Sequence, residues 1–241
     1  MIKSISVVIP AFNEAERIVP TIRRVNEYFL EKEVEFELVI VDDGSSDRTA
    51  DLVRREADAI RGIKLLCSGF NQGKGSAVKK GVFAASHDVL LVSDADLSTP
   101  IEEVEKLYPW LENGYDIVIG SRSLEDSLVA IKQPWYRQNM GKIFNVLVWL
   151  FALRDFHDTQ CGFKIFRKGA AQNVFTRARI SGFAFDVEVL YIAFKMGYRI
   201  KEVPVTWFNS PQSKVRVIRD PALMFFDLLR IRHLHRNEFR Q

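Results

Sequence analysis

The sequence has little cysteine and no long apolar run, and each absence excludes a class of protein. Its two cysteines, Cys67 and Cys161, are too few for a disulfide framework and lack the spacing of a metal site. We expect both to be small residues that are buried or partly buried. The longest apolar run, 146–153, is far shorter than the roughly 20 residues that a membrane-spanning helix needs. No segment has the pattern of a signal peptide, so we expect the protein in the cell interior.

The sequence also lacks an even distribution of acidic and basic residues along its length. Residues 1–120 contain 14 Lys and Arg against 21 Asp and Glu, whereas residues 121–241 contain 20 against 10. Solvated faces explain most charge runs, but an acidic half would suit a metal–nucleotide and a basic half an anion or an anionic surface. With 241 residues, 47% of them hydrophobic, the chain can bury the core of one domain.

Strand and helix patterns alternate regularly in the first half of the chain. Strands are predicted at 4–10, 36–42, 63–67, 88–93 and 115–120, with helices at about 15–31, 47–61, 75–86 and 100–112. This alternation predicts an α/β fold with a Rossmann-like, mostly parallel sheet flanked by helices. The second half is less regular. It predicts a loop at 123–136, strands near 162–166 and 199–206, and helices at about 138–153, 168–176, 183–196 and from 221.

Carboxylates follow directly on two of the predicted buried strands. Asp94 and Asp96 follow the run 89–93, and Asp42 ends the strand 36–42. Because the carboxyl ends of parallel strands meet at one edge of a sheet, where ligands bind, we expect these side chains to converge. The strand 4–10 ends at the same edge and adds three more residues to it: Pro10, Asn13 and Glu14.

Two explanations fit Asp94 and Asp96 taken alone. Aspartate commonly caps a helix, and a helix is predicted from residue 100. Two carboxylates separated by one residue also suit a hard divalent cation that takes its remaining ligands from water and phosphate. The second acidic turn, at Asp42 and Asp43, favours the cation together with a nucleoside diphosphate.

A glycine-rich segment at 69–76, GFNQGKGS, resembles a phosphate-binding loop but matches neither common template. Three residues, not four, separate Gly69 from Gly73, and Gly75 rather than Ser or Thr follows Lys74. Val78 stands where the dinucleotide fingerprint has its third glycine. The segment therefore predicts only a turn that opens a helix and brings backbone amides and Lys74 near phosphate or ribose.

Several motifs, in this order, give the chain a family resemblance. They are VVIPAFNE (7–14), VDDGSSD (41–47), NQGKG (71–75), DADLS (94–98), GSR (120–122), DTQCGFK (158–164), FAFDVE (183–188) and SK (213–214). The set resembles the inverting family 2 glycosyltransferases of GT-A fold, in the branch that glycosylates polyprenyl or dolichyl phosphate. The DTQCGFK and FAFDVE versions are most similar to those of dolichyl-phosphate β-glucosyltransferases.

This resemblance implies a nucleotide-sugar and metal-binding half at 1–120. Residues that would bind the nucleotide sugar are Pro10, Asn13, Glu14, Asp42, Lys74 and Asp94. Asp96 would coordinate Mg²⁺ or Mn²⁺ directly, and Asp94 would face ribose or the same metal. The cation would offset the charge that develops on the leaving diphosphate. Surface positions on helices are the alternative for Glu14 and Lys74.

The resemblance also implies an acceptor-binding half at 121–241. Arg122, Arg137 and Lys214 match the positions that hold the acceptor phosphate, and Arg216 and Arg219 lie close by in sequence. Arginine suits this task because its guanidinium binds phosphate bidentately. For Arg137, contact with solvent or with a lipid headgroup is the alternative.

Asp158 and Asp186 are the candidates for a base or an orienting group in this half. Asp158 matches a position proposed as the base in related enzymes, but it could equally orient Arg122, Lys164 or sugar hydroxyls. Asp186 and Glu188 lie on an apolar helix face, where a satisfied buried carboxylate is the plainer explanation. Together with Arg122, Asp96 and Asp158 complete the expected catalytic set.

The implied reaction is inverting transfer of a hexose, glucose from UDP-glucose in the first place, to the phosphate of dolichyl or another polyprenyl phosphate. Within the class, the alternative is a mannosyl or N-acetylhexosaminyl transferase that uses the same lipid or a soluble acceptor. A non-catalytic regulator that binds sugar nucleotides is the alternative from another class. No feature points to a nucleic-acid partner.

A polyprenyl phosphate stays in the bilayer, so a chain without a spanning helix must come to it. Segments 138–153 and 221–236 combine apolar and aromatic residues with Arg or His, which suits helices that lie in a membrane interface. Core packing or a homodimer contact would explain the same pattern. We expect a cytoplasmic protein that is peripheral at the cytoplasmic face of a membrane.

Overall fold

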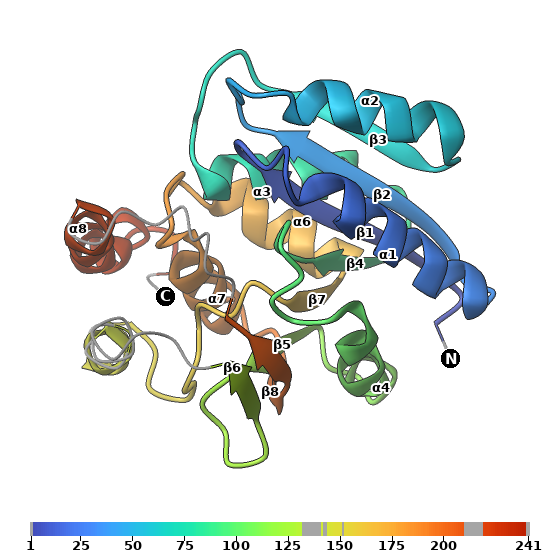
Figure 1. Ribbon diagram of the computed structural model, residues 1–241. Coiled ribbons are helices and arrows are strands. Elements are labelled where there is room, and N and C mark those ends of the chain that lie inside the picture. Colours follow the sequence, from blue (N-terminus) through green and yellow to red (C-terminus); the bar gives the residue numbers. More distant parts are fainter. Residues whose placement is uncertain (1, 132–140, 142–143, 151, 210–218, 240–241) are drawn as a thin grey trace.

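The computed structural model of the chain describes residues 2–131, 141, 144–150, 152–209 and 219–239 (Figure 1). Its first half contains β1 (Ser4–Ala11), α1 (Ile18–Glu31), β2 (Glu35–Asp42), α2 (Thr49–Ala59), β3 (Ile63–Cys67), α3 (Lys74–Ala84), β4 (Val89–Val92), the 3₁₀ turn η1 (Ile101–Glu103), α4 (Val104–Glu112) and β5 (Ile117–Ser121). The second half contains β6 (Leu128–Ile131), β7 (Lys164–Arg167), α6 (Lys168–Arg177), α7 (Phe185–Lys195), β8 (Ile200–Pro204), β9 (Thr206–Phe208) and α8 (Arg219–Leu234). Residues 144–150 are also helical.

Seven of the strands form one sheet in the order β3-β2-β1-β4-β7-β5-β8. All neighbours in it run parallel except β7, which is antiparallel to both β4 and β5. The α/β fold with a mostly parallel sheet flanked by helices is therefore confirmed. A strand from the second half of the chain lies inside the sheet, so the core contains strands of both halves.

Three local predictions are wrong. The predicted loop 123–136 contains β6, which pairs in parallel with β9 in a separate two-stranded sheet. The predicted strand 199–206 is divided at Val205 between β8 and β9, directly after Pro204, whose nitrogen cannot donate a hydrogen bond. Cys67 is exposed at the end of β3, whereas Cys161 is buried as expected.

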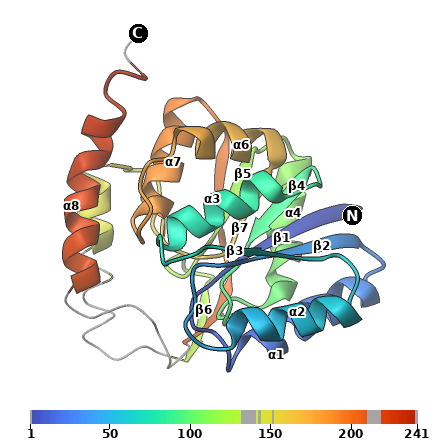
Figure 2. The same ribbon diagram turned by 90° about the horizontal axis from the view of Figure 1, so that it is seen from above.

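Helices cover both faces of the large sheet (Figure 2). One apolar cluster joins the sheet to α1, α2 and α4 through residues such as Ile22, Val53 and Leu107. The other joins it to α3, α6, α7 and α8, with Val82 and Leu190 among its fully buried members. Strand β1 supplies side chains to both clusters, Ile9 to the first and Val8 to the second, which is the pattern of a strand buried on both faces.

A buried histidine–carboxylate pair attaches the end of α8 to α7. His235, just beyond the end of α8, is fully buried, and its Nε2 lies 2.8 Å from Oε1 of Glu188, which is also fully buried. Backbone N–H groups of Arg179 and Ile180 donate to the same carboxylate. Burial alone would lower the pKa of His235, but the hydrogen bonds and charges of Glu188 and Glu238 outweigh burial and raise it.

Segment 138–153 is helical at 141 and 144–150 but not at 152–153, and segment 221–236 is helical as far as Leu234, the last residue of α8. Among the described residues, none of the helices combines the length and the apolar character that crossing a bilayer requires.

Protonation of His235 is expected to stabilise the fold, since the pKa of this histidine is raised on folding from 6.5. This contribution is fully present below about pH 6.5 and is lost as the pH rises through the higher folded-state pKa. In urea unfolding across this range, His235→Gln should lose most stability relative to wild type at the acid end, and the difference should shrink as the pH rises.

His233→Gln, on the exposed side of the same helix, is the matched control. A stability difference between wild type and His235→Gln that stays constant with pH would contradict the assignment of a charged histidine.

Candidate active site

The carboxyl ends of β1, β2 and β4 form the edge at which the acidic turns meet. Ala11 at the end of β1 pairs with Asp42 at the end of β2, and Val8 pairs with Val92 of β4 on the other side. The Ser93 N–H donates to the Val8 carbonyl at 3.0 Å, so the chain enters the turn at Asp94 directly beside β1. The predicted convergence of the two acidic turns is therefore what the sheet register produces.

Asn13 braces the loops that follow β1 and β2. It has a left-handed backbone, with φ of 55°, and its Oδ1 accepts hydrogen bonds from the backbone N–H groups of Ser46 and Asp47. Its own N–H donates to Ser45 Oγ at 2.8 Å. The position expected to bind nucleotide sugar thus uses its carbonyl oxygen to shape the loops, while the buried Pro10 lies in β1 opposite Val41.

Arg17 connects the first loop to the metal-ligand candidate. Glu14 is buried, and its Oε2 accepts from Arg17 Nε at 2.7 Å and lies 2.6 Å from Nη2. Nη1 of the same guanidinium lies 3.6 Å from Oδ2 of Asp96. Oδ1 of Asp96 accepts a hydrogen bond from the Ser98 N–H at 3.0 Å. These two contacts fix the orientation of the Asp96 carboxylate, and about one-fifth of its side chain is exposed.

Lys74 and Asp94 form an ion pair across the site. Lys74 is the first residue of α3, and its Nζ lies 2.6 Å from Asp94 Oδ1. Burial would raise the pKa of Asp94, but the charge and hydrogen bond of Lys74 outweigh it and lower the pKa. Gly162 makes room for the pair, because a Cβ there would lie 2.1 Å from Oδ2 of Asp94.

The backbone amides of the glycine-rich turn are engaged by the protein itself. Gln72 and Gly73 N–H groups donate to the buried Asp43, the latter at 2.7 Å, and the Gly75 N–H donates to the Ser181 carbonyl at 2.8 Å. Gly73 has φ of 101° and a Cβ there would meet that carbonyl oxygen at 2.4 Å. The side chain of Lys74, rather than these amides, therefore reaches the acidic edge.

Arg122 and Asp158 form a bidentate ion pair. Nε and Nη2 of Arg122 donate to the two oxygens of Asp158 at 2.7 and 2.8 Å, and the Arg122 N–H donates to Oδ2 at 3.0 Å. The guanidinium carbon also lies 5.5 Å from the ring centre of Trp207. Burial alone would raise the pKa of Asp158, but the charge and hydrogen bonds of Arg122 lower it. Asp158 is consequently a weak proton acceptor.

A second buried pair joins β7 to α7. Lys164 Nζ lies 2.5 Å from Asp186 Oδ1 and donates to the Cys161 carbonyl. The charge of Lys164 also contributes to the lowered pKa of Asp94, so the two pairs are neighbours. Glu188, two residues beyond Asp186, pairs with His235 instead. Both carboxylates of α7 thus have hydrogen-bond partners, as expected for buried carboxylates on an apolar helix face.

Three buried oxygen atoms near this edge have no hydrogen-bond partner among the described residues. They are Oδ1 of Asp42, Oγ of Ser93 and Oγ1 of Thr159. Oδ2 of Asp42 accepts from the Ser45 N–H at 3.2 Å, so one oxygen of this carboxylate is engaged and the other is not. A buried carboxylate oxygen without a donor is costly, and a ligand that donates a hydrogen bond would satisfy it.

Three acceptor-side candidates lie outside the described residues: Arg137, Lys214 and Arg216. Of the rest, Arg219 begins α8, with a side chain outside the described part. Sequence reasoning missed Arg17 and Trp207. Arg17 follows Glu14 by three residues, and this spacing could have indicated an ion pair between them. For Trp207, 85 positions beyond Arg122, no local signal exists.

The acidic edge fits a hard divalent cation that is shared with a ligand. In the described part of the chain, no three His, Cys, Asp or Glu side chains are grouped so that they could hold a metal by themselves. Asp94 and Asp96 offer oxygen ligands from one turn, and Mg²⁺ or Mn²⁺ commonly uses one or two carboxylates with phosphate oxygens and water. The donor set is therefore suitable when a diphosphate completes it.

Comparisons with known proteins find relatives over most of the chain. The family model described as glycosyl transferase family 2 matches residues 6–175. The chain is 36% identical over 240 residues to a dolichyl-phosphate beta-glucosyltransferase of Dictyostelium discoideum, covering 95% of this chain and 73% of the relative. The human protein of the same name is 35% identical over 249 residues, covering 95% and 75%.

A solved structure has the same fold at low sequence identity. Glucosyl-3-phosphoglycerate synthase from Mycobacterium tuberculosis, in complex with Mn²⁺ and uridine-diphosphate-glucose, superposes with a TM-score of 0.68 at 17% identity. The match covers 99% of this chain and 80% of that one.

Asp158→Asn should lower the free energy of unfolding by about 3 kcal/mol, because it leaves Arg122 without its buried counter-charge. The side chain of Arg122 keeps 28% exposure, which places the effect at the low end of the range for buried pairs. Asp51→Asn removes an exposed pair with Arg54 and should change stability by less than about 1 kcal/mol. Equal effects in urea unfolding of the two variants would contradict the structural role of Asp158.

Proposed function

Because the chain belongs to the glycosyl transferase family 2, we propose that it transfers glucose from UDP-glucose to the phosphate of dolichyl or another polyprenyl phosphate. The observation that carries the proposal is the meeting of two acidic strand ends, at Asp42 and Asp94, close to the fixed guanidinium of Arg122. The relatives named above are glucosyltransferases whose names give dolichyl phosphate as the acceptor.

Asp42 is the proposed contact for the base. Its buried Oδ1 has no donor among the described residues, and Oδ2 is engaged by Ser45. Uracil presents one N–H donor on its pairing edge, whereas guanine presents two adjacent donors and would use both oxygens of a carboxylate. The single oxygen without a donor matches the single N–H donor of uracil, which supports a uridine nucleotide.

A divalent cation at Asp94 and Asp96 would stabilise the negative charge that develops on the leaving diphosphate. Lys74 is already in place beside Asp94 and would add a second positive charge on the same side. Arg17 holds the orientation of the Asp96 carboxylate through the contact at 3.6 Å. We assign Glu14 to the same structural task, since it holds Arg17.

Arg122 is the proposed contact for the acceptor phosphate. Asp158 takes Nε and Nη2, and none of the described residues accepts a hydrogen bond from Nη1. Trp207 supports the face of the guanidinium. The remaining N–H groups can hold a phosphate oxygen for attack on the anomeric carbon, opposite the leaving nucleotide, which inverts the configuration. Arg137 and Lys214 stay proposed partners on the sequence argument alone.

The reaction needs no strong base from the protein. A phosphate monoester has a second pKa near 6, so its attacking oxygen is already anionic at neutral pH. The pKa of Asp158 is lowered by Arg122, which makes this carboxylate unsuited to accept a proton. We therefore propose that Asp158 positions Arg122, and that Asp186, paired with Lys164, has no part in proton transfer.

Because the proposed acceptor lipid lies in a bilayer, glucosyl transfer would take place at a membrane. We propose peripheral attachment at its cytoplasmic face.

Transfer of label from UDP-glucose into an organic-extractable lipid is expected when a polyprenyl phosphate in detergent and Mn²⁺ or Mg²⁺ are supplied. Asp96→Asn should lower the rate roughly hundredfold or more, since a metal ligand is lost. Asp58→Asn, an exposed position on α2, is the control. Label from GDP-mannose or UDP-N-acetylglucosamine in place of UDP-glucose would overturn the donor assignment, and binding of UDP without any transfer would favour a regulator.

Asp42→Asn should weaken UDP binding by roughly 10-fold to 100-fold, because a charged acceptor of a hydrogen bond is worth about 1.5–3 kcal/mol. CDP is the informative comparison, since cytosine has an acceptor at the ring position where uracil has its N–H. Wild type should bind UDP more tightly than CDP, and Asp42→Asn should reduce this difference in affinity. Titration calorimetry with both nucleotides measures it, and an unchanged UDP-to-CDP ratio would refute the base contact.

A further inference from the structure

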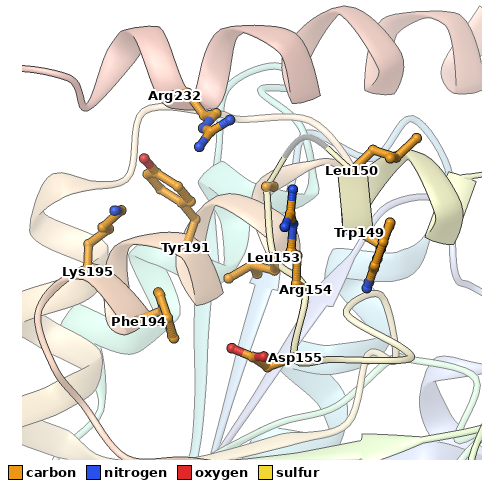
Figure 3. Close-up of a pocket in the computed structure, with 10 residues that line it drawn as sticks. Trp149, Leu150, Leu153, Arg154, Asp155, Tyr191, Phe194, Lys195 and Arg232 are labelled. Atoms are coloured by element: carbon orange, nitrogen blue, oxygen red, sulfur yellow. The ribbon is translucent and has the colours of Figure 1, made fainter.

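We propose that a pocket between α7, α8 and residues 149–150 and 152–155 binds the phosphodiester headgroup of an anionic phospholipid and so seats this face of the protein on a bilayer. The pocket has a volume of about 300 Å³. Figure 3 shows Arg232 reaching it from α8, Tyr191 and Lys195 lining it from α7, and Arg154 lying between Tyr191 and Trp149. None of the residues proposed for catalysis lines it.

Positive charge predominates among the side chains that line the pocket. Three cations, Arg154, Lys195 and Arg232, come from three separate segments, against one carboxylate, Asp155. In the described part of the chain, none of these cations forms an ion pair with a carboxylate. An anion with several oxygens, such as a phosphodiester, would offset this charge.

Two of the cations lie over aromatic rings. The guanidinium carbon of Arg154 is 5.4 Å from the ring centre of Trp149, and Lys195 Nζ is 5.9 Å from that of Tyr191. These contacts keep the charged groups at the surface next to apolar rings. Side chains with an apolar body and a charged end suit the boundary between lipid tails and headgroups.

The rim of the pocket is apolar and exposed. Trp149, Leu150 and Phe194 line the pocket and each keep 47–48% of their surface exposed. On α8, Phe226 and Leu229 precede Arg232 and are 61% and 43% exposed. Figure 2 shows α8 beside the helix at 144–150, so these side chains come from neighbouring elements. Apolar area together with cations favours a membrane surface over a soluble anion.

Charge complementarity selects a bilayer rather than a second copy of the chain. In a two-fold symmetric dimer through this face, the same three cations of each copy would meet those of the other. An anionic membrane supplies the opposite charge, and each Lys or Arg near its surface contributes about 1 kcal/mol. The rim residues would then enter the boundary between headgroups and lipid tails.

Flotation with phospholipid vesicles tests the proposal without substrate. Vesicles of phosphatidylcholine alone are compared with vesicles that also contain phosphatidylglycerol, and neither contains polyprenyl phosphate. Wild type should bind the anionic vesicles at least tenfold more tightly, and added salt should weaken that binding.

Matched variants test whether binding depends on this face or only on the overall charge and apolar surface of the protein. The double variant Lys195→Glu/Arg232→Glu should bind anionic vesicles at least tenfold more weakly, whereas Arg55→Glu/Arg61→Glu, two exposed positions in and just after α2, should bind as wild type does. Phe194→Ser should weaken binding several-fold, and its control is Leu30→Ser, 62% exposed on α1.

Equal binding to neutral and anionic vesicles, or an unchanged double variant, would overturn the proposal. Competition by glycerol 3-phosphate at a concentration that leaves ionic strength unchanged would instead indicate a soluble small anion. A dimer in solution that the double variant abolishes would indicate a second copy as the occupant. Glucosyl transfer to detergent-dispersed acceptor, measured in parallel, should be retained in the double variant, so failure of docking and failure of the proposed function are distinguishable.

Discussion

The site depends on three ion pairs, each of which joins a carboxylate at or near the sheet edge to a cation of the chain. Asp94 meets Lys74, Asp158 meets Arg122, and Asp186 meets Lys164. Carboxylates delivered together to the ends of parallel strands would repel one another, and burial would raise their pKa values. Lys74 reverses that tendency at Asp94 and Arg122 reverses it at Asp158, so that the pKa values of these two carboxylates are lowered and both stay ionised.

Contacts within the protein also determine which polar groups of the site are left to bind substrates. Asp43 and Asn13 are used to shape loops, and the amides of Gln72, Gly73 and Gly75 are engaged by Asp43 and Ser181. Within the described part of the chain, Oδ1 of Asp42 on the donor side and Nη1 of Arg122 on the acceptor side have no hydrogen-bond partner. The proposed donor and acceptor contacts are thus defined by what the protein itself leaves unpaired.

Residues whose placement follows from strand periodicity could be predicted from the sequence. Asp42 and Asp94 lie where buried strands end, and sheet topology alone brings them together. The pairing of Arg122 with Trp207 could not be predicted, because it depends on how β8 and β9 separate after Pro204. The antiparallel entry of β7 between β4 and β5 likewise follows from long-range pairing, which periodicity does not encode. The attachment of α8 through His235 depends on Glu188, 47 positions away.

The most direct test of the central claim is the structure of the product formed from UDP-glucose labelled with ¹³C at the anomeric carbon and a polyprenyl phosphate. The account predicts a β-glucosyl phosphate, with the anomeric carbon coupled to the phosphorus of the acceptor in the NMR spectrum. An α-linked product would contradict inversion by direct displacement. Free glucose as the sole product would contradict the acceptor phosphate contact at Arg122.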